Sequence, residues 1–128
     1  MTNEERVREF MAKAEQRVPE HLEWPTDYVL RLRLNLIKEE FKELEEATLY
    51  GNIESVADAI ADLLYVVYGT GIAFGLPVQE VFEEIHRSNM TKFTDGFKDP
   101  RSGKWIKGPS WSPPNLEPIL KHGPESVP

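Results

Sequence analysis

Residues 53–74 read IESVADAIADLLYVVYGTGIAF, and this stretch decides the fold. It predicts a long helix that is apolar on every side between Ile60 and Tyr68, except at Asp62. Before it, residues 27–50 carry apolar side chains at steps of four and three, which is the pattern of one helix face: Leu30, Leu34, Ile37, Phe41 and Leu44. Gly51 and Asn52 separate the two helices, as these residue types commonly do at helix ends. Two long helices joined by a short turn predict an all-α fold.

The flanking segments predict shorter elements around this pair. A helix is expected over residues 3–17, ended by Pro19, and an extended linker over 18–25, with Trp24 packing on the helices. A fourth helix is expected over residues 77–89, burying Val78, Val81, Phe82 and Ile85. The proline- and glycine-rich stretch 91–128 predicts loops, a short hairpin around 99–103, a helical turn near 116–121 and a frayed end at 122–128. We therefore expect a single domain over 1–128, an antiparallel bundle of about four helices over 3–90 with an irregular C-terminal extension over 91–128.

Composition narrows the class of protein. The chain has 128 residues, a formal net charge of −7 and no cysteine. The missing thiol excludes disulfides, thiolate metal sites and cysteine nucleophiles. The negative charge argues against nucleic acid as a partner. No apolar run approaches the roughly 20 residues of a membrane span, and the charged N-terminus does not resemble a secretion signal, so a cytoplasmic protein with no membrane partner is expected.

Several acids occupy positions where a simple helical bundle would place apolar side chains. On a helical projection, Glu40 lies between Leu36 and Leu44, in the middle of the buried face, and Glu43 lies at its edge. Asp62 interrupts the apolar helix, and Asp58 lies one turn before it on a similar side. Aspartate is a poor helix former, so its presence there needs another explanation.

Converging buried carboxylates require a cation nearby. Burying one unpaired carboxylate costs on the order of several kcal/mol, and several would also repel one another. An oxygen-only ligand set without cysteine or a histidine pair favours Mg²⁺, or Mn²⁺, over Zn²⁺. Two other interpretations remain open: a solvated acidic helix face, or a buried ion pair of Asp62 with Arg31 or Arg33.

The acidic segments resemble a known superfamily, the all-α nucleoside triphosphate pyrophosphatases, which includes MazG-like proteins, dimeric dUTPases and phosphoribosyl-ATP pyrophosphohydrolase. The resemblance spans about residues 28–115 and rests on EEFKE at 39–43, DAIADLLYVVYG at 58–69, IHRSNMTK at 85–92 and GKWIKGP at 103–109. One position departs from the family pattern, which usually has a glutamate three residues before Asp62. That position is Ala59 here, and the acid is Asp58, one residue earlier.

The resemblance implies a Mg²⁺-dependent hydrolase that cleaves a nucleoside triphosphate between the α- and β-phosphates, with dUTPase-like house-cleaning as its expected role. It implies a catalytic role for Glu39 and Glu40 and the metal ligands Glu40, Glu43, Asp58 and Asp62. It also implies substrate contacts by Asn89 and Lys92. Lys107 in the C-terminal tail and Arg33, which lies on the same side of its helix as Glu40, are further candidates for binding the substrate. The family is oligomeric, and the apolar third helix of so small a chain also favours a homodimer.

Three rival functions are weighed against this one. The chain can be a catalytically silent nucleotide-binding or regulatory helical dimer in which Ala59 has removed turnover. It can be a di-iron bundle, which Glu83 and His86 superficially suggest, although that architecture needs the motif twice and a second copy is absent. It can also be a purely structural dimerisation module.

Overall fold

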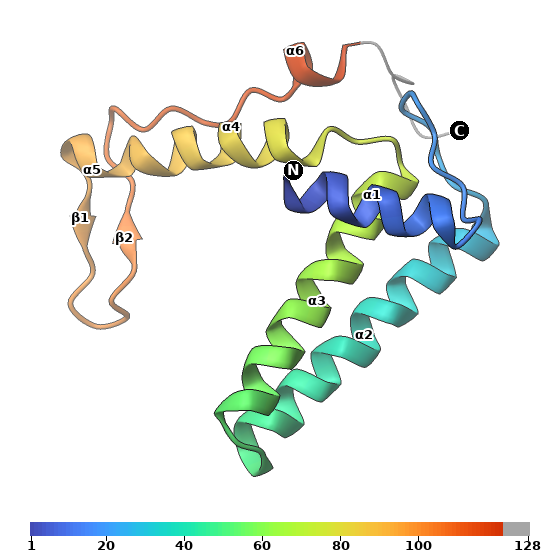
Figure 1. Cartoon of the computed structure of the whole chain (residues 1–128). Helices are drawn as coiled ribbons and strands as arrows, with labels where there is room; N and C mark the ends of the chain where they lie inside the picture. Colours follow the sequence, from blue (N-terminus) through green and yellow to red (C-terminus); the bar gives the residue numbers. More distant parts are fainter. Residues whose placement is uncertain (122–128) are drawn as a thin grey trace. The chain divides into compact units, whose positions relative to one another are not determined.

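The computed structural model describes residues 1–121, which are helical apart from loops and one short β-hairpin (Figure 1). The predicted all-α class with an irregular C-terminal region is confirmed. The chain divides into two compact units, residues 1–78 and 79–121, and each is described by itself. The fraying expected at residues 122–128 lies outside the described residues.

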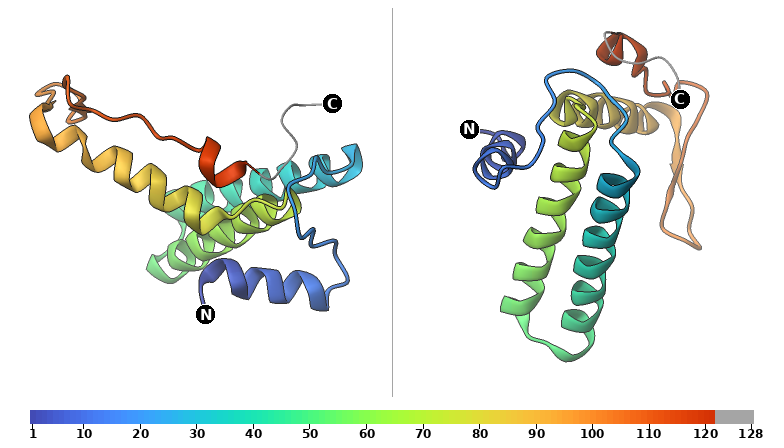
Figure 2. Two further views of the ribbon diagram at one scale, coloured as in Figure 1. Left: turned by 90° about the horizontal axis from the view of Figure 1, so that it is seen from above. Right: turned by 90° about the vertical axis from the view of Figure 1, so that its right-hand side faces the viewer.

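Two long helices, α2 (Asp27–Tyr50) and α3 (Ile53–Ala73), run antiparallel side by side in the first unit (Figures 1 and 2). The Thr26 side chain caps α2 by accepting a hydrogen bond from the Val29 N–H. The Asn52 side chain caps α3 in the same way, by accepting from the Ser55 N–H. The predicted bounds of α2 are confirmed, and α3 ends one residue before the predicted end at Phe74. The caps and Gly51 are local signals that limit both helices.

The first helix, α1 (Asn3–Lys13), packs against α3 and is shorter than predicted. It ends four residues before the expected position because Glu15 adopts a left-handed backbone conformation with a φ of 60°. The Gln16 N–H then donates to the Met11 carbonyl and the Glu15 N–H to the Ala12 carbonyl, which closes a Schellman motif. Glycine usually marks this motif, so a glutamate there gives no warning in the sequence.

A small apolar core holds α1 to the helix pair. It consists of Val7 and Met11 from α1 and Ile72 from α3, with Val18 and Tyr68 packed around them. The predicted packing of Trp24 is confirmed, since its ring meets that of Phe74 edge to face with centroids 5.4 Å apart. The core therefore holds α1 against the part of α3 that carries Tyr68 and Ile72.

Much of α3 stays uncovered in the single chain. Ile60, Leu64 and Val67 are 46–50% exposed, and they recur at steps of four and three. By length and composition alone α3 also qualifies as a membrane span, with a mean hydropathy of 1.4, although core helices of soluble proteins pass the same test. Within one chain, this apolar helix is therefore not buried on every side.

The second unit contains most of α4 (Val78–Met90), then α5 (Lys92–Asp95), the strands β1 (Phe97–Lys98) and β2 (Trp105–Ile106), and α6 (Glu117–Leu120). The predicted hairpin and C-terminal helical turn are confirmed. The predicted burial of Phe82 is wrong, since this residue is 67% exposed. The buried residue of α4 is Ser88, whose hydroxyl contacts the tail, and helical periodicity does not reveal this contact.

Candidate functional site

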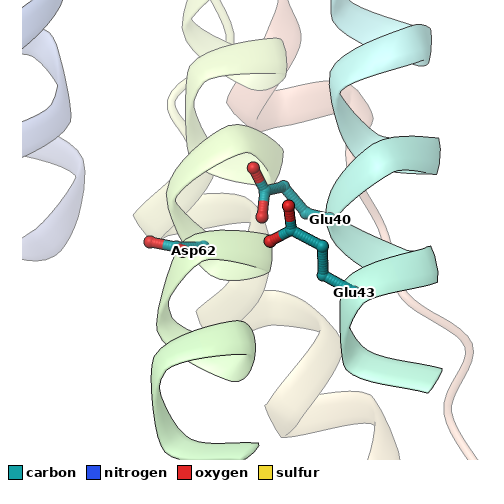
Figure 3. Close-up of side chains that lie close together, drawn as sticks. All are labelled: Glu40, Glu43 and Asp62. Atoms are coloured by element: carbon teal, nitrogen blue, oxygen red, sulfur yellow. The ribbon is translucent and has the colours of Figure 1, made fainter. Parts of the chain in front are cut away.

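Three carboxylates of the helix pair lie close together in the first unit. Glu40 and Glu43 lie one turn apart on α2 and project towards α3, which carries Asp62 (Figure 3). One carboxylate oxygen from each residue lies within 4.8 Å of the other two. We call these residues the acidic cluster. Among residues 1–121, this is the grouping of His, Asp and Glu ligand atoms that is close enough for a shared metal ion.

Within residues 1–121, no ion pair of 4.0 Å or less joins a basic side chain to the acidic cluster. One oxygen of Glu40, Oε2, is enclosed by protein and has no hydrogen-bond partner. Burial raises the pKa of Glu40, and the adjacent Glu43 carboxyl and the charge of Asp62 raise it further. Burial also raises the pKa of Asp62, with contributions from Asp58 and Glu43. Without a cation, the carboxylates of Glu40 and Asp62 are therefore harder to ionise than in solution.

Neither candidate arginine neutralises Asp62. Arg31 pairs with Asp27 on its own helix, with 3.0 Å between Nε and the carboxylate oxygen. The Arg33 side chain is buried between the helices, where its Nη2 donates to the Val66 carbonyl at 3.1 Å. Within residues 1–121, no ion pair of 4.0 Å or less links either arginine to Asp62. The alternative of a buried Asp62–arginine pair is therefore not what the fold forms.

The small residues of α3 allow Arg33 to enter the helix interface. Ala59, Gly69 and Ala73 of α3 are all buried. A side chain at Gly69 would collide with the Arg33 guanidinium. Burial lowers the pKa of Arg33, and its Nε has no partner. Its observed contacts hold the helices together, and a role in substrate binding stays a prediction.

The other predicted acids lie beside the cluster. Glu39 and Asp58 are exposed, and neither belongs to the group of three. Their charges still reach the cluster, since Glu39 contributes to the raised pKa of Glu40 and Asp58 to that of Asp62. The position three residues before Asp62, Ala59, is only 4% exposed. Roles for Glu39 in catalysis and for Asp58 in metal binding stay predictions.

The remaining predicted substrate residues belong to the second unit. Asn89, Lys92 and Lys107 line one cavity of about 350 Å³. Ser88 also lines this cavity and is not among the residues predicted from the sequence. Its hydroxyl donates to the Ser112 carbonyl at 2.7 Å. A serine inside an amphipathic helix gives no distinctive signal. His86 is exposed and lies outside the acidic cluster, so the described residues provide no di-iron ligand set.

The acidic cluster suits a hard divalent cation. Its donors are all carboxylate oxygens, which are the ligands that Mg²⁺ and Mn²⁺ prefer. The enclosed and unpaired Glu40 oxygen is the particular feature that a bound cation would satisfy. The residues present therefore fit a metal.

Comparison with known proteins agrees with this chemistry. A family model described as phosphoribosyl-ATP pyrophosphohydrolase matches residues 7–89. A protein of Acanthamoeba polyphaga mimivirus, described as uncharacterized protein L479, is 36% identical over 83 residues, which cover 55% of this chain and 33% of that protein. This chain thus spans about a third of that relative's length. The chain belongs to the phosphoribosyl-ATP pyrophosphohydrolase family, within the MazG-like all-α nucleoside triphosphate pyrophosphatase superfamily, whose members have a nucleotide pyrophosphohydrolase type of activity and typically use a divalent metal.

Proposed function

We propose that this protein hydrolyses a nucleoside triphosphate between its α- and β-phosphates, giving a nucleoside monophosphate and pyrophosphate. The observation that carries the proposal is the convergence of Glu40, Glu43 and Asp62 within 4.8 Å, with an oxygen of Glu40 enclosed and unpaired. Mg²⁺, or Mn²⁺, is the proposed cofactor. When bound to these carboxylates it would neutralise phosphate charge and lower the pKa of a bound water.

The chain's own residues suggest water as the nucleophile. Cysteine is absent, and several serine hydroxyls of the described residues are engaged in structural hydrogen bonds, such as Ser88 with Ser112 and Ser110 with Asp95. Water would form a bond to the α-phosphorus while the bond to the bridging oxygen breaks, and pyrophosphate would leave. We assign Glu39 to orient this water and accept its proton, because its exposed carboxylate adjoins Glu40.

A nucleotide panel tests the proposed reaction. Canonical and non-standard ribo- and deoxynucleoside triphosphates, including dUTP and dCTP, are incubated with Mg²⁺ or with EDTA, and pyrophosphate and monophosphate are measured. We expect the two products in equal amounts, from at least one nucleotide and only with metal. Release of inorganic phosphate and a diphosphate instead would contradict the assigned bond. The same panel tests the house-cleaning role, because non-standard or deoxynucleotides should then be preferred.

One observation favours a second candidate, a catalytically silent nucleotide-binding protein. Ala59 occupies the position where the family usually has an acid, and this alanine is buried. If the acid at that position is needed for turnover, the chain would bind nucleotides without cleaving them. Binding in the panel without product formation would support this candidate over the hydrolase.

We also propose that the protein is a homodimer. Support comes from apolar positions of α2 and α3 that the helical pattern assigns to a buried face but that one chain leaves open: Leu34 at 54%, Phe41 at 51%, Ile60 at 46% and Leu64 at 50% exposure. A second copy would cover them. Light scattering should give twice the chain mass for the wild type and the chain mass for Ile60→Glu. Ala12→Glu, on the exposed side of α1, should remain dimeric. A monomeric wild type at micromolar concentration would contradict the proposal.

A further inference from the structure

The most deeply buried side chain of α2 is an arginine. Arg33 is 6% exposed, and no other residue of this helix is as buried. Its Nη2 donates to the Val66 carbonyl of α3 at 3.1 Å, and the Thr70 hydroxyl donates to the same carbonyl at 2.8 Å. One contact between the two long helices is therefore a hydrogen bond from a charged side chain inside their interface.

This contact is a poor choice for stability alone. Burial lowers the pKa of Arg33, so the charged form is less favourable there than in water. Within residues 1–121, no carboxylate forms an ion pair with its guanidinium, and its Nε is enclosed without a hydrogen-bond partner. Replacing a buried charge by an apolar side chain of similar volume is often neutral or stabilising. The stability of the helix pair therefore does not explain an arginine at this position.

Gly69 of α3 provides the space for this guanidinium. A Cβ atom at Gly69 would collide with Nη2 of Arg33. A glycine inside a helix is less favourable than an alanine, because it loses more backbone freedom on folding. Two unfavourable features, a buried charge and a glycine inside a helix, thus meet at a single contact between α2 and α3.

The same interface carries the acidic cluster nearly two helical turns away. Glu40 lies seven residues after Arg33 on α2, and Asp62 lies seven residues before Gly69 on α3. Seven residues bring a side chain back to almost the same side of a helix, about 10 Å further along its axis. Because α2 and α3 run antiparallel side by side (Figure 2), the arginine–glycine contact and the approach of Glu40 to Asp62 follow one another along one interface. A shift of the helices at the first contact therefore changes their spacing at the second.

We propose that Arg33 is a positioning residue for the acidic cluster. Its guanidinium, seated against Gly69 and hydrogen-bonded to Val66, fixes the spacing and register of α2 and α3, and these decide whether the three carboxylates can share one cation. Mg²⁺ requires nearly ideal ligand geometry, and groups that orient metal ligands without touching the ion strongly affect its affinity. The choice of a metal ion rests on the proposed function.

Two rival roles of Arg33 predict different results. It also borders a cavity of about 280 Å³, together with Phe10 and Tyr65, so it could contact a substrate there. A substrate contact predicts unchanged metal binding in the absence of nucleotide. A purely electrostatic role predicts tighter metal binding when the arginine is removed, because a positive charge near the acids then disappears. The positioning role alone predicts weaker binding.

Manganese titration without nucleotide separates these three roles. Electron paramagnetic resonance distinguishes free from bound Mn²⁺. Arg33→Met removes the guanidinium, and Gly69→Ala keeps the arginine but fills its space; each should weaken Mn²⁺ binding by about tenfold. The double variant should bind Mn²⁺ as Arg33→Met does, since both changes remove the same contact. Arg31→Met, which removes the same charge from an exposed position of α2, should leave the affinity within about twofold.

Urea unfolding and circular dichroism show whether weaker binding is merely a loss of fold. Arg33→Met should resist urea at least as well as the wild type, because it removes a buried charge. Mn²⁺ binding by Arg33→Met as tight as that of the wild type, or tighter, would overturn the proposal. Losses in the two single variants that multiply in the double variant would also overturn it. Should Arg33→Met not fold, Gly69→Ala decides, since an unchanged Mn²⁺ affinity of that variant would contradict the positioning role.

Activity measurements keep this proposal distinguishable from the proposed hydrolysis. Arg33→Met should need about tenfold more Mn²⁺ for its half-maximal rate, and at saturating Mn²⁺ its KM for the nucleotide should stay within about twofold. A change in that KM alone would identify a substrate contact instead. Wild-type Mn²⁺ binding that depends on Arg33, without pyrophosphate release, would leave the positioning role standing and the hydrolysis wrong. Metal-dependent hydrolysis with an unaltered Mn²⁺ affinity in Arg33→Met would do the reverse, and no Mn²⁺ binding by the wild type would contradict both.

Discussion

Glu40→Gln should lower the rate of pyrophosphate release by at least about 100-fold while leaving the helical fold intact. The substitution preserves the size of the side chain but removes the charge of the carboxylate that has an enclosed, unpaired oxygen. Because the amide is a weak ligand for a hard cation, the acidic cluster would lose its central donor. The rate is measured with saturating Mg²⁺ on the best nucleotide of the panel, and the fold by circular dichroism.

A control on the same helix makes this result specific. Glu45 is exposed and lies on the far side of α2 from Glu40, so Glu45→Gln removes the same charge away from the cluster. We expect this variant to keep its activity within about twofold of the wild type. Near-wild-type turnover by Glu40→Gln, or an equal loss in both variants, would show that Glu40 does not hold the metal.

Asp62→Asn should stabilise the metal-free protein, and more so as pH rises. The pKa of Asp62 is raised in the folded state, first by burial and then by the charges of Asp58 and Glu43. Between the ordinary carboxyl pKa of about 4 and the raised value, the folded state binds more protons than the unfolded state, so rising pH lowers the free energy of unfolding. Asp62→Asn has no carboxyl group at this position, so its free energy of unfolding does not fall with rising pH for this reason. The difference between the two proteins should therefore be small below about pH 4 and should grow above it.

Urea unfolding in EDTA across this pH range measures the effect, and Glu23→Gln is its control of opposite sign. Arg17 contacts the Glu23 carboxylate at 2.6 and 2.7 Å and lowers its pKa. Glu23→Gln should therefore lower the free energy of unfolding at pH values above the ordinary carboxyl pKa. Equal stability of wild type and Asp62→Asn at every pH would contradict the electrostatic account of the cluster. Added Mg²⁺ should reverse the order, because only the wild type would gain stability by binding it.

The helix pair was predictable because its signals are local. Caps at Thr26 and Asn52 and the stop at Gly51 lie next to the residues they limit, and the apolar steps fix which side of α2 meets α3. The same projection placed Glu40 among apolar neighbours, so the convergence with Asp62 followed from two independent helix patterns. Asp58 shows the limit of this reasoning, since a similar helical side did not bring it into the group of three.

The features that were not predicted depend on contacts between distant residues or on rare backbone conformations. The early end of α1 results from the left-handed conformation of Glu15, which glycine would have signalled. The cavity depends on pairs such as Ser88 in α4 with Ser112 in the irregular tail, which lie 24 residues apart. Periodicity describes one helix at a time and carries no information about such pairs. The sequence offered Lys107 and Asn89 as candidates without showing that they share a cavity.

Diffraction from crystals grown with Mn²⁺ would test the central claim most directly, because the anomalous signal of manganese locates the ion independently of its ligands. The account predicts an ion bound directly by carboxylate oxygens of Glu40, Glu43 and Asp62, and no ion there in Asp62→Asn crystals. Manganese found only elsewhere in the chain, with these three carboxylates left unligated, would contradict it.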